Sequence, residues 1–278
     1  MTRTGEPATS ARSALILADI EGIVGVHRKA QCKPGTTAWR ATRELMTADV
    51  NAAVRGLRAA GVERITVRDM HGPGFNLRPQ QLEPGVVCIQ GQYGRPVLLL
   101  GEVPRVDCAV MVGWHAGPDQ EDAFSPHMFH RRLRAMRVNG DPVTEVELFA
   151  AVLGDHGVPV VAVTADAPAV ERISRNLPWI RSVRVPKQEL SEAATREIRL
   201  EIEATCRAAF AQRDAASPLV LGEHRAEMDT SEGSDSWVAG CGLETYERAV
   251  MGSVFRPYPR PLVFLLLTLH RWRWRLRG

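Results

Sequence analysis

Short apolar segments alternate with longer amphipathic segments through the first two thirds of this 278-residue chain, and no other feature constrains its fold as strongly. The apolar segments have the length of buried strands, and they lie at residues 14–18, 64–68, 86–89, 107–112 and 158–163. Helical spacing of apolar side chains falls between them, at residues 40–60, 146–155 and 168–176. Apolar strands that alternate with helices are typical of a mostly parallel sheet covered on both faces. The sequence therefore predicts a three-layer α/β domain.

The pattern changes after Pro186. Residues 191–212 have the spacing of a long amphipathic helix, residues 218–221 and 245–255 resemble strands, and residues 262–274 close the chain. We therefore expect three parts, namely a flexible arm at residues 1–12, an α/β domain at 13–185 and a smaller C-terminal α+β unit at 186–278.

Charge and hydropathy exclude several classes of partner. The 35 basic and 32 acidic residues give a net charge of +3, which is too balanced for a dedicated nucleic-acid binder. The longest apolar run, residues 262–269, is far shorter than the roughly 20 residues that cross a bilayer. The polar residues 1–12 lack the apolar core of a secretory signal. The tail at 271–277 alternates arginine with tryptophan, and we expect it to end the last helix and to bind neither nucleic acid nor a membrane.

The five cysteines are scattered along the chain and form no Cys-x-x-Cys pair. This usage is typical of a reducing compartment, so we expect a cytoplasmic protein. It also argues against a disulfide framework and against a metal site made of thiolates.

Polar side chains follow three of the predicted strands at the point where each strand ends. Asp19 and Glu21 follow the first strand, His71 follows the second, and His115 follows the strand at 107–112. Residues two apart in extended chain point to the same side, and the carboxyl ends of parallel strands are where ligands gather. Each motif alone is also consistent with a solvated loop or a hydrogen-bonded turn. Together, carboxylates and imidazoles without thiolates favour zinc, manganese or iron in a catalytic site.

Two later segments add candidates to the same set. His127 lies in a loop, and Glu145 opens the helix predicted to begin near residue 146. Thr144 and Glu147 have the spacing of a capping box, so Glu147 is expected to cap the helix and leave Glu145 free to point elsewhere. The alternative is that Glu145 is present only because a negative charge is favoured at a helix start.

In chain order these motifs resemble the series of the D-aminopeptidase family of zinc peptidases, family M55. The motifs are Asp19-Ile-Glu21-Gly22, Asp69-Met-His71-Gly72, Gly113-Trp-His115-Ala116, Ser125-Pro-His127 and Thr144-Glu145. The likeness runs from about residue 13 into the C-terminal unit, so it implies that 13–185 is the catalytic domain. It implies further that the C-terminal unit contributes to the substrate pocket and to contacts in a homo-oligomer, which has the form of a ring in this family.

The resemblance also implies a site with two Zn²⁺ per chain, with Mn²⁺ or Fe²⁺ as alternatives. The residues that match the family's metal ligands are Asp19, Glu21, His71, His115 and Glu145, with Asp19 as the candidate bridge between the ions. His127 matches the catalytic histidine. Two ions about 3.5–4 Å apart lower the pKa of a shared water and polarise a carbonyl. His127 would then stabilise the oxyanion or pass a proton to the leaving amine, while attack as a nucleophile stays a further alternative.

Several positions depart from the family's pattern. Glu147 and Phe149 replace a glycine and an asparagine, Trp114 replaces a tyrosine, and the segment at residues 187–192 lacks the arginine expected near Glu192. We therefore expect an altered surface around the substrate. The leading hypothesis is a metal-dependent aminopeptidase or amidohydrolase acting on a small amide or peptide. The alternatives are an amidase or acyl-transfer enzyme of specialised metabolism, and a small-molecule binding protein without turnover.

Overall fold

Six parallel strands form the main sheet of the protein, which we describe from a computed structural model that covers residues 11–256 and 258–275. Their order across the sheet is β3-β2-β1-β4-β7-β8, and every neighbouring pair is parallel. The strands are β1 (Ser13–Ala18), β2 (Arg64–Asp69), β3 (Val86–Ile89), β4 (Cys108–Trp114), β7 (Val160–Ala165) and β8 (Arg181–Arg184). The five predicted strands and the predicted parallel sheet are confirmed, and β8 is an additional edge strand.

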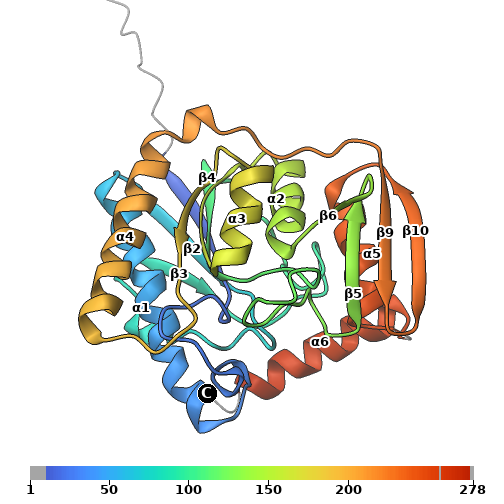
Figure 1. The fold of residues 1–278 in the computed structure, drawn as a ribbon, viewed down its shortest axis with the longest axis horizontal. Helices are drawn as coiled ribbons and strands as arrows, with labels where there is room; N and C mark the ends of the chain where they lie inside the picture. Colours follow the sequence, from blue (N-terminus) through green and yellow to red (C-terminus); the bar gives the residue numbers. More distant parts are fainter. Residues whose placement is uncertain (1–10, 257, 276–278) are drawn as a thin grey trace, which may run out of the picture.

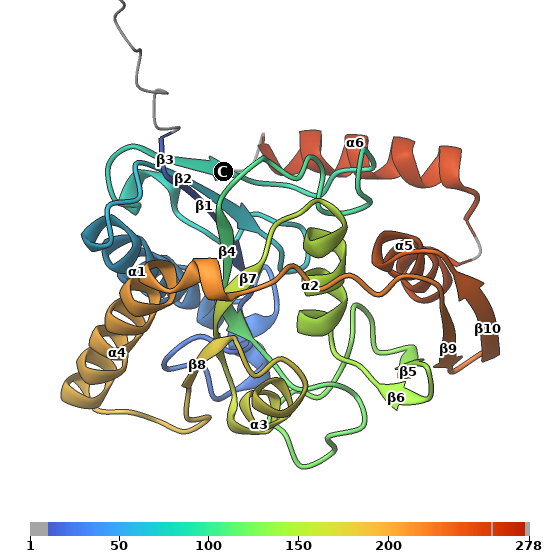
Figure 2. The ribbon, with the colours of Figure 1, turned by 90° about the horizontal axis from the view of Figure 1, so that it is seen from above.

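Helices cover both faces of this sheet (Figures 1 and 2). One face carries α1 (Thr37–Ala59) and α4 (Glu192–Ala211), which pack against each other, and the other face carries α2 (Glu145–Asp155) and α3 (Ala167–Asn176). The predicted helices at 40–60, 146–155, 168–176 and 191–212 are therefore confirmed, as is the three-layer α/β class. Three short 3-10 helices lie in the loops, at Lys29–Cys32, Pro79–Gln81 and Arg213–Ala215.

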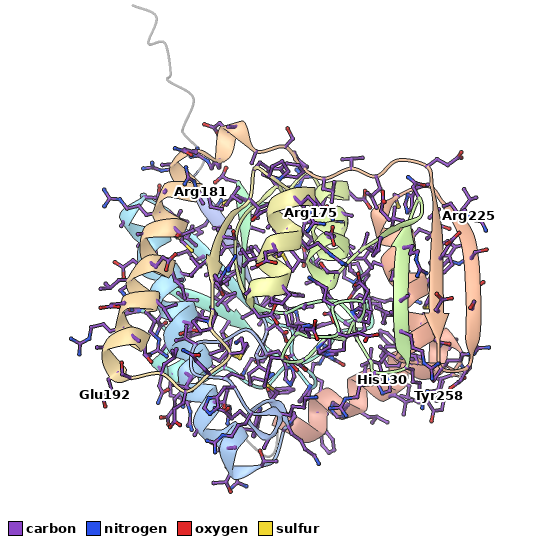
Figure 3. All side chains as sticks on the ribbon, in the orientation of Figure 1. His130, Arg175, Arg181, Glu192, Arg225 and Tyr258 are labelled. Carbon is purple, nitrogen blue, oxygen red and sulfur yellow. The ribbon has the colours of Figure 1, made fainter. Side chains whose placement is uncertain are left out.

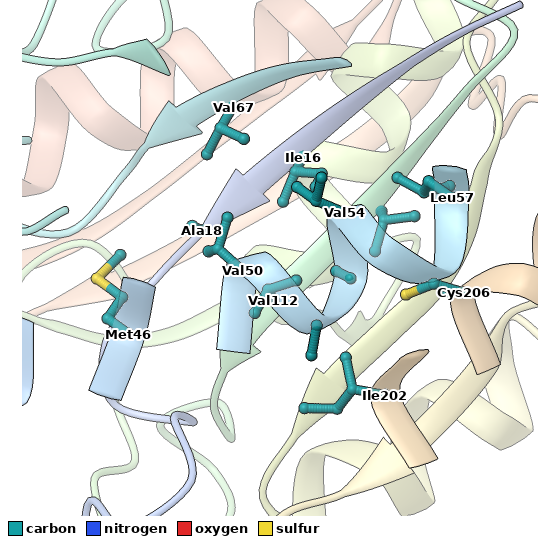
Figure 4. Close-up of a cluster of buried hydrophobic side chains, with 14 of the residues drawn as sticks. Ile16, Ala18, Met46, Val50, Val54, Leu57, Val67, Val112, Ile202 and Cys206 are labelled. Carbon is teal, nitrogen blue, oxygen red and sulfur yellow. The ribbon is translucent and has the colours of Figure 1, made fainter. Parts of the chain in front are cut away.

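Successive side chains of β1 enter different cores, as the period of two along a strand requires. Ile16 and Ala18 belong to the core under α1 and α4, where Figure 4 shows them beside Val50 and Val54 of α1. Leu15 and Leu17 belong to the core under α2 and α3. Because both faces of β1 are buried, the chain that follows the strand leaves the sheet at a fixed position.

A second sheet is antiparallel and lies beside the main one in Figure 1. Its order is β10-β9-β5-β6, and it is covered by α5 (Gly242–Ser253). The strands are β5 (Leu133–Val138), β6 (Asp141–Pro142), β9 (His224–Thr230) and β10 (Gly233–Ala239). The sheet takes strands from both sides of residue 186. The boundary near 186 stays a prediction, and it divides the chain by sequence rather than by sheet.

Two strand predictions in the C-terminal part are wrong. Residues 218–221 have no regular structure, and most of 245–255 belongs to α5. The buried side chains of α5 are spaced as on one helix face, because Tyr246, Ala249, Val250 and Ser253 recur three and four residues apart. In a strand the buried side chains would recur every second residue, so this spacing is that of a helix.

The chain ends in α6 (Arg260–Arg275), which buries Val263 and Leu267 in the core that also contains α5 residues. The expectation that the tail ends the last helix is confirmed as far as residue 275. Trp272 is 65% exposed. Within residues 11–256 and 258–275, no helix combines the length and the apolar character needed to cross a membrane. Most of the arm predicted at 1–12 and the last three residues of the chain lie outside the described residues.

Candidate metal centre

The residues predicted to bind metal come together at one edge of the main sheet. β2, β1 and β4 are adjacent and parallel, so the segments that follow them start side by side. Asp19 and Glu21 follow β1, His71 lies two residues beyond β2, and His115 is the first residue after β4. Glu145 is the first residue of α2.

Glycine 22 allows two of these segments to approach closely. The Gly22 backbone N–H donates to the carbonyl of Gly113 at 2.7 Å, which joins the β1 loop to the end of β4. A Cβ atom on Gly22 would lie 2.0 Å from the carbonyl oxygen of Trp114, so no larger residue fits here without moving backbone. The glycine of the Asp19-Ile-Glu21-Gly22 motif therefore sets how near Glu21 and His115 lie to each other.

Each of the two strand-end histidines is close to carboxylate oxygens. His71 Nδ1 lies 3.3 Å from Asp19 Oδ1 and 3.0 Å from Glu21 Oε2. His115 Nε2 lies 3.6 Å from Asp19 Oδ2 and 3.7 Å from Glu145 Oε1. Asp19 is thus the residue that faces both imidazoles.

The second nitrogen of each ring points away from the carboxylates, to the backbone. His71 Nε2 is 2.8 Å from the carbonyl oxygen of Cys32, and His115 Nδ1 is 2.9 Å from that of Ala116. A carbonyl oxygen only accepts, so these ring nitrogens are donors, and whenever a ring is neutral its lone pair lies on the nitrogen that faces the carboxylates. Metal-ligating histidines are held in this way by their other ring nitrogen.

Two carboxylate oxygens fit the same interpretation. Asp19 Oδ2 and Glu21 Oε2 are buried, and neither accepts a hydrogen bond of good geometry within the described part of the chain. Buried polar atoms are nearly always paired, so an unpaired acceptor calls for a partner such as a cation. The donor set of carboxylate oxygens and imidazole nitrogens suits zinc in a catalytic site.

The protonation of the centre reflects burial and its negative charge. Burial, followed by the charge of Glu21, raises the pKa of Asp19 to about 6. Burial alone would also raise the pKa of Glu21, but His71 outweighs it and holds that pKa well below its usual range. Burial disfavours the charged form of His71, yet Glu21 and Asp19 raise the pKa of His71 well above its usual value. In the absence of metal, a proton on His71 therefore supplies the positive charge that these carboxylates need.

His127 lies against His115, with the two rings stacked at a centroid distance of 4.2 Å and an angle of 6°. Its Nδ1 is 3.0 Å from the carbonyl of Ser125, which turns the ring so that Nε2 faces the centre. Burial opposes protonation of His127, but Glu21 and Glu145 outweigh it and raise its pKa. Potential ligand atoms of His127, His115 and Glu145 lie within 4.8 Å of one another, so the geometry suits either a ligand or a proton donor.

Glu145 is held in place by the loop that carries His127. Its Oε1 accepts from the backbone N–H of Phe129 at 2.6 Å, and burial raises its pKa. Glu147 instead accepts from the backbone N–H of Thr144 at 2.7 Å, as predicted for a residue that caps the helix. The contacts therefore match the prediction that Glu147 caps the helix and that Glu145 points elsewhere.

Sequence reasoning missed residues that support the centre without facing it. Asp69 is fully buried and accepts from the backbone N–H groups of Asn76 and Leu77, while the Asn76 side chain donates to the carbonyl of His71. Lys187 donates through Nζ to the carbonyls of Glu21 at 2.8 Å and Ile23 at 3.1 Å. Lys187 is one of only three lysines in the chain, and no motif spacing pointed to it.

Two cavities meet at the centre, and His127 and Phe129 line both. The inner cavity, of about 150 Å³, contains the ligand candidates and has an apolar wall formed by Met70, Leu99, Phe149 and Val254. The outer cavity, of about 720 Å³, includes Glu21 and opens toward basic side chains.

Of the three substituted positions expected to alter the substrate surface, Phe149, Trp114 and Glu147, one lies there. Phe149 lines the inner cavity, whereas Trp114 is fully buried and donates to the carbonyl of Leu17 at 3.1 Å. Glu147 is occupied with the helix cap and with Asn176. The expectation is therefore wrong for Trp114 and Glu147, because their side chains are used inside the fold.

The fold and the cluster together define a class, namely an α/β protein with a carboxylate and imidazole centre of the kind that holds catalytic transition-metal ions. The chain belongs to the peptidase M55 family, described as D-aminopeptidase, whose sequence profile matches residues 13–240. The family resemblance inferred from the motifs is thereby confirmed.

Two proteins from Bacillus subtilis illustrate the likeness. A D-aminopeptidase of strain 168 is 27% identical over 178 residues, which are 64% of this chain and 64% of that protein. The aligned part is therefore less than two thirds of that relative. The solved structure of the Zn-dependent D-aminopeptidase DppA, a self-compartmentalizing protease, matches with a TM-score of 0.75 and 21% identity, over 92% of this chain and 98% of the other. At that identity the match shows a shared fold.

Proposed function

We propose that the protein is a zinc-dependent aminopeptidase that removes a D-amino acid from short peptides. The observation that carries the proposal is the orientation of His71 and His115, each of which turns one ring nitrogen to a backbone carbonyl and the other to buried carboxylates. Two Zn²⁺ per chain, or Mn²⁺ or Fe²⁺ in their place, would be held by Asp19, Glu21, His71, His115 and Glu145.

The ligand residues divide into two groups around Asp19. His71 lies beside Asp19 Oδ1 and Glu21, and His115 lies beside Asp19 Oδ2 and Glu145; Glu21 is also near the second group, since ligand atoms of Asp19, Glu21 and His115 lie within 4.8 Å of one another. The Asp19 side chain offers one oxygen to each group, so it is the residue able to bridge two ions. When bound, zinc would supply an activated water near neutral pH and polarise the scissile carbonyl.

His127 would assist the reaction as a proton carrier. The raised pKa of this residue favours the imidazolium, whose Nε2–H can stabilise an oxyanion or donate to the leaving amine. His127→Ala is expected to keep the bound zinc and lose at least about 100-fold in kcat. Loss of zinc from this variant would instead make His127 a ligand.

The experiment that tests the proposal combines metal analysis with a hydrolysis screen. Protein purified without chelator should contain about two transition ions per chain. The screen should compare D- and L-aminoacyl amides, dipeptides and non-peptide amides, and it should find turnover of D-aminoacyl substrates. Turnover of non-peptide amides alone would favour the amidase alternative, for which Phe149 in the inner cavity is the remaining structural argument. Absence of bound zinc would favour the binding protein without turnover.

We also propose that the protein is a cytoplasmic homo-oligomer that forms a ring. All five cysteines are free, as expected in a reducing compartment. The C-terminal unit would contribute Val254 to the substrate pocket and the exposed apolar side chains of α6, such as Leu265 and Leu269, to contacts with a second copy. Sedimentation of the native protein tests this assembly, and a monomer would contradict it.

A further inference from the structure

The outer cavity has a charge that the proposed chemistry does not require. Glu21 and His127 form its inner wall, and Lys29, Arg131 and Arg134 line its outer part together with Glu121. Three permanent cations therefore share the cavity with one carboxylate that is not part of the metal centre. Since the cavity begins at His127, this charge lies directly beside the reacting groups.

The three cations are available to a ligand. Lys29, Arg131 and Arg134 are exposed, and none has an ion-pair partner among residues 11–256 and 258–275. Arg132, the neighbour of Arg131 in sequence, differs in both respects, because it lies 3.7 Å from Glu232 and does not line the cavity. The cations that line the cavity are therefore unpaired, whereas the neighbouring arginine outside it is paired. The patch is for this reason more than a consequence of the chain's high arginine content.

The pKa of His130 reflects the positive potential of the same region. Figure 3 labels this side chain close to the lower end of β5, and it lines the outer cavity. Its pKa is lowered by burial, then by Arg132, His127 and Arg131. His130 is therefore neutral near pH 7, where it can donate or accept a hydrogen bond without adding charge.

The two cavities have opposite electrostatic character. The inner cavity contains the carboxylates of Asp19 and Glu145, and metal ions bound to them would close that end of it. Its volume of about 150 Å³ suits the first residue of a substrate. A leaving group that extends past His127 enters the outer cavity, which at about 720 Å³ has room for one or two residues. The carboxylate at the end of such a leaving group would meet the guanidinium groups of Arg131 and Arg134, which pair with carboxylates in a bidentate manner.

We propose that Lys29, Arg131 and Arg134 form a subsite that binds a carboxylate on the leaving-group side of the substrate. The inference rests on the proposed function, and it specifies the substrate class as short peptides that end in a free carboxylate, in preference to neutral amides. A side-chain carboxylate of the leaving residue offers the same chemistry, so the two sources must be separated by experiment.

The test uses three substrates of the zinc-loaded protein that differ at one group, namely D-Ala-D-Ala, D-Ala-D-Ala amide and D-Ala-D-Glu amide. The free acid should exceed the amide at least about tenfold in kcat/KM, mainly through KM, because a charge-assisted hydrogen bond contributes this much. Recovery of the rate with D-Ala-D-Glu amide would assign the subsite to a side-chain carboxylate. Equal rates for all three substrates would overturn the proposal.

Matched variants locate the effect. Arg131→Gln combined with Arg134→Gln should remove most of the preference for the acid and leave hydrolysis of the amide unchanged. Arg132→Gln is the control, and it should retain the preference, because Arg132 pairs with Glu232 outside the cavity. A double variant that slows acid and amide equally would contradict the assignment.

A binding measurement separates this inference from the proposed activity. Titration calorimetry of the metal-free protein should show tighter binding of D-Ala-D-Ala than of its amide, and this difference should weaken with added salt and in the double variant. If no substrate is hydrolysed but this difference is present, the proposed activity fails and the carboxylate subsite stands. If the acid and the amide bind equally, the subsite fails whatever the activity.

Discussion

Replacing Gly22 by alanine is expected to disrupt the metal centre without touching a ligand. The added Cβ would lie 2.0 Å from the Trp114 carbonyl oxygen and 2.4 Å from the Gly113 carbonyl carbon, whereas ordinary contact begins at 3.4 Å. The two backbone segments must therefore separate by about 1.4 Å. No flexible side chain can relieve the contact, because the atoms it meets are the backbone immediately before His115.

This displacement has consequences for stability and for function. Overpacking of this kind costs about 1–3 kcal/mol, and a clash with backbone places the variant at the upper end. A shift of about 1 Å in catalytic groups lowers rates about 100-fold, and a distorted ligand environment weakens metal binding about 10- to 100-fold. The assays are competition for zinc with a chromogenic chelator, thermal unfolding, and kcat/KM on a D-aminoacyl amide.

Gly240→Ala is the matched control for this experiment. A Cβ on Gly240 has Glu244 Oε2, at 4.0 Å, as its nearest neighbour, so this substitution meets open space. It should leave zinc affinity and turnover unchanged. If Gly22→Ala retained the zinc affinity and rate of the unmodified protein, the close approach of Glu21 and His115 would not be what organises the centre.

Three further outcomes are expected. Glu145→Ala should lose one of two zinc ions and at least about 100-fold in kcat while unfolding at nearly the same temperature, and unchanged hydrolysis would mean that Glu145 only favours the helix start. Leu99→Gly should raise kcat/KM for a D-Phe amide relative to a D-Ala amide about tenfold, because the Leu99 side chain narrows the inner cavity. The backbone φ of Leu99, 64°, is one that glycine adopts readily, so the substitution suits the backbone. An unchanged ratio of the two kcat/KM values would mean that another residue limits the size of the substrate. Zinc affinity should fall as the pH drops, because the metal must displace the proton that His71 holds through its raised pKa and, below about pH 6, a proton on Asp19 as well; calorimetry should detect proton release on binding, with more protons released below pH 6.

The main sheet was predictable because its strands carry unbroken apolar runs. β1 and β4 are buried along their whole length, so hydrophobicity alone marks their bounds. β8 was not predicted, because only Val183 of its sequence Arg-Ser-Val-Arg is buried. β5 and β9 were not predicted for a similar reason. Each alternates buried and polar residues, and its strand character becomes evident only from its pairing in the second sheet.

The candidate site was predictable to the extent that its residues follow strands directly. Asp19, His71 and His115 come within two residues of a strand end, so parallel order alone places them together. The two cavities were not predictable, because Leu99, Val254 and Arg131 reach the site from loops whose paths depend on tertiary contacts. For Leu99 that path is fixed by the buried Arg68, which donates to the carbonyls of Ile89, Leu99 and Leu100.

The rarity of lysine in this sequence points to residues at the site that the spacing of the motifs does not identify. Only three of the 35 basic residues are lysines, and two of them, Lys29 and Lys187, lie at the site. At Lys187 a compact ammonium fits between the carbonyls of Glu21 and Ile23, and burial there lowers its pKa to about 8. A guanidinium is larger and planar, and its fixed fork of donors matches a carboxylate rather than two separate carbonyls in a closed space. At Lys187 the shape of the cation therefore matters as much as its charge.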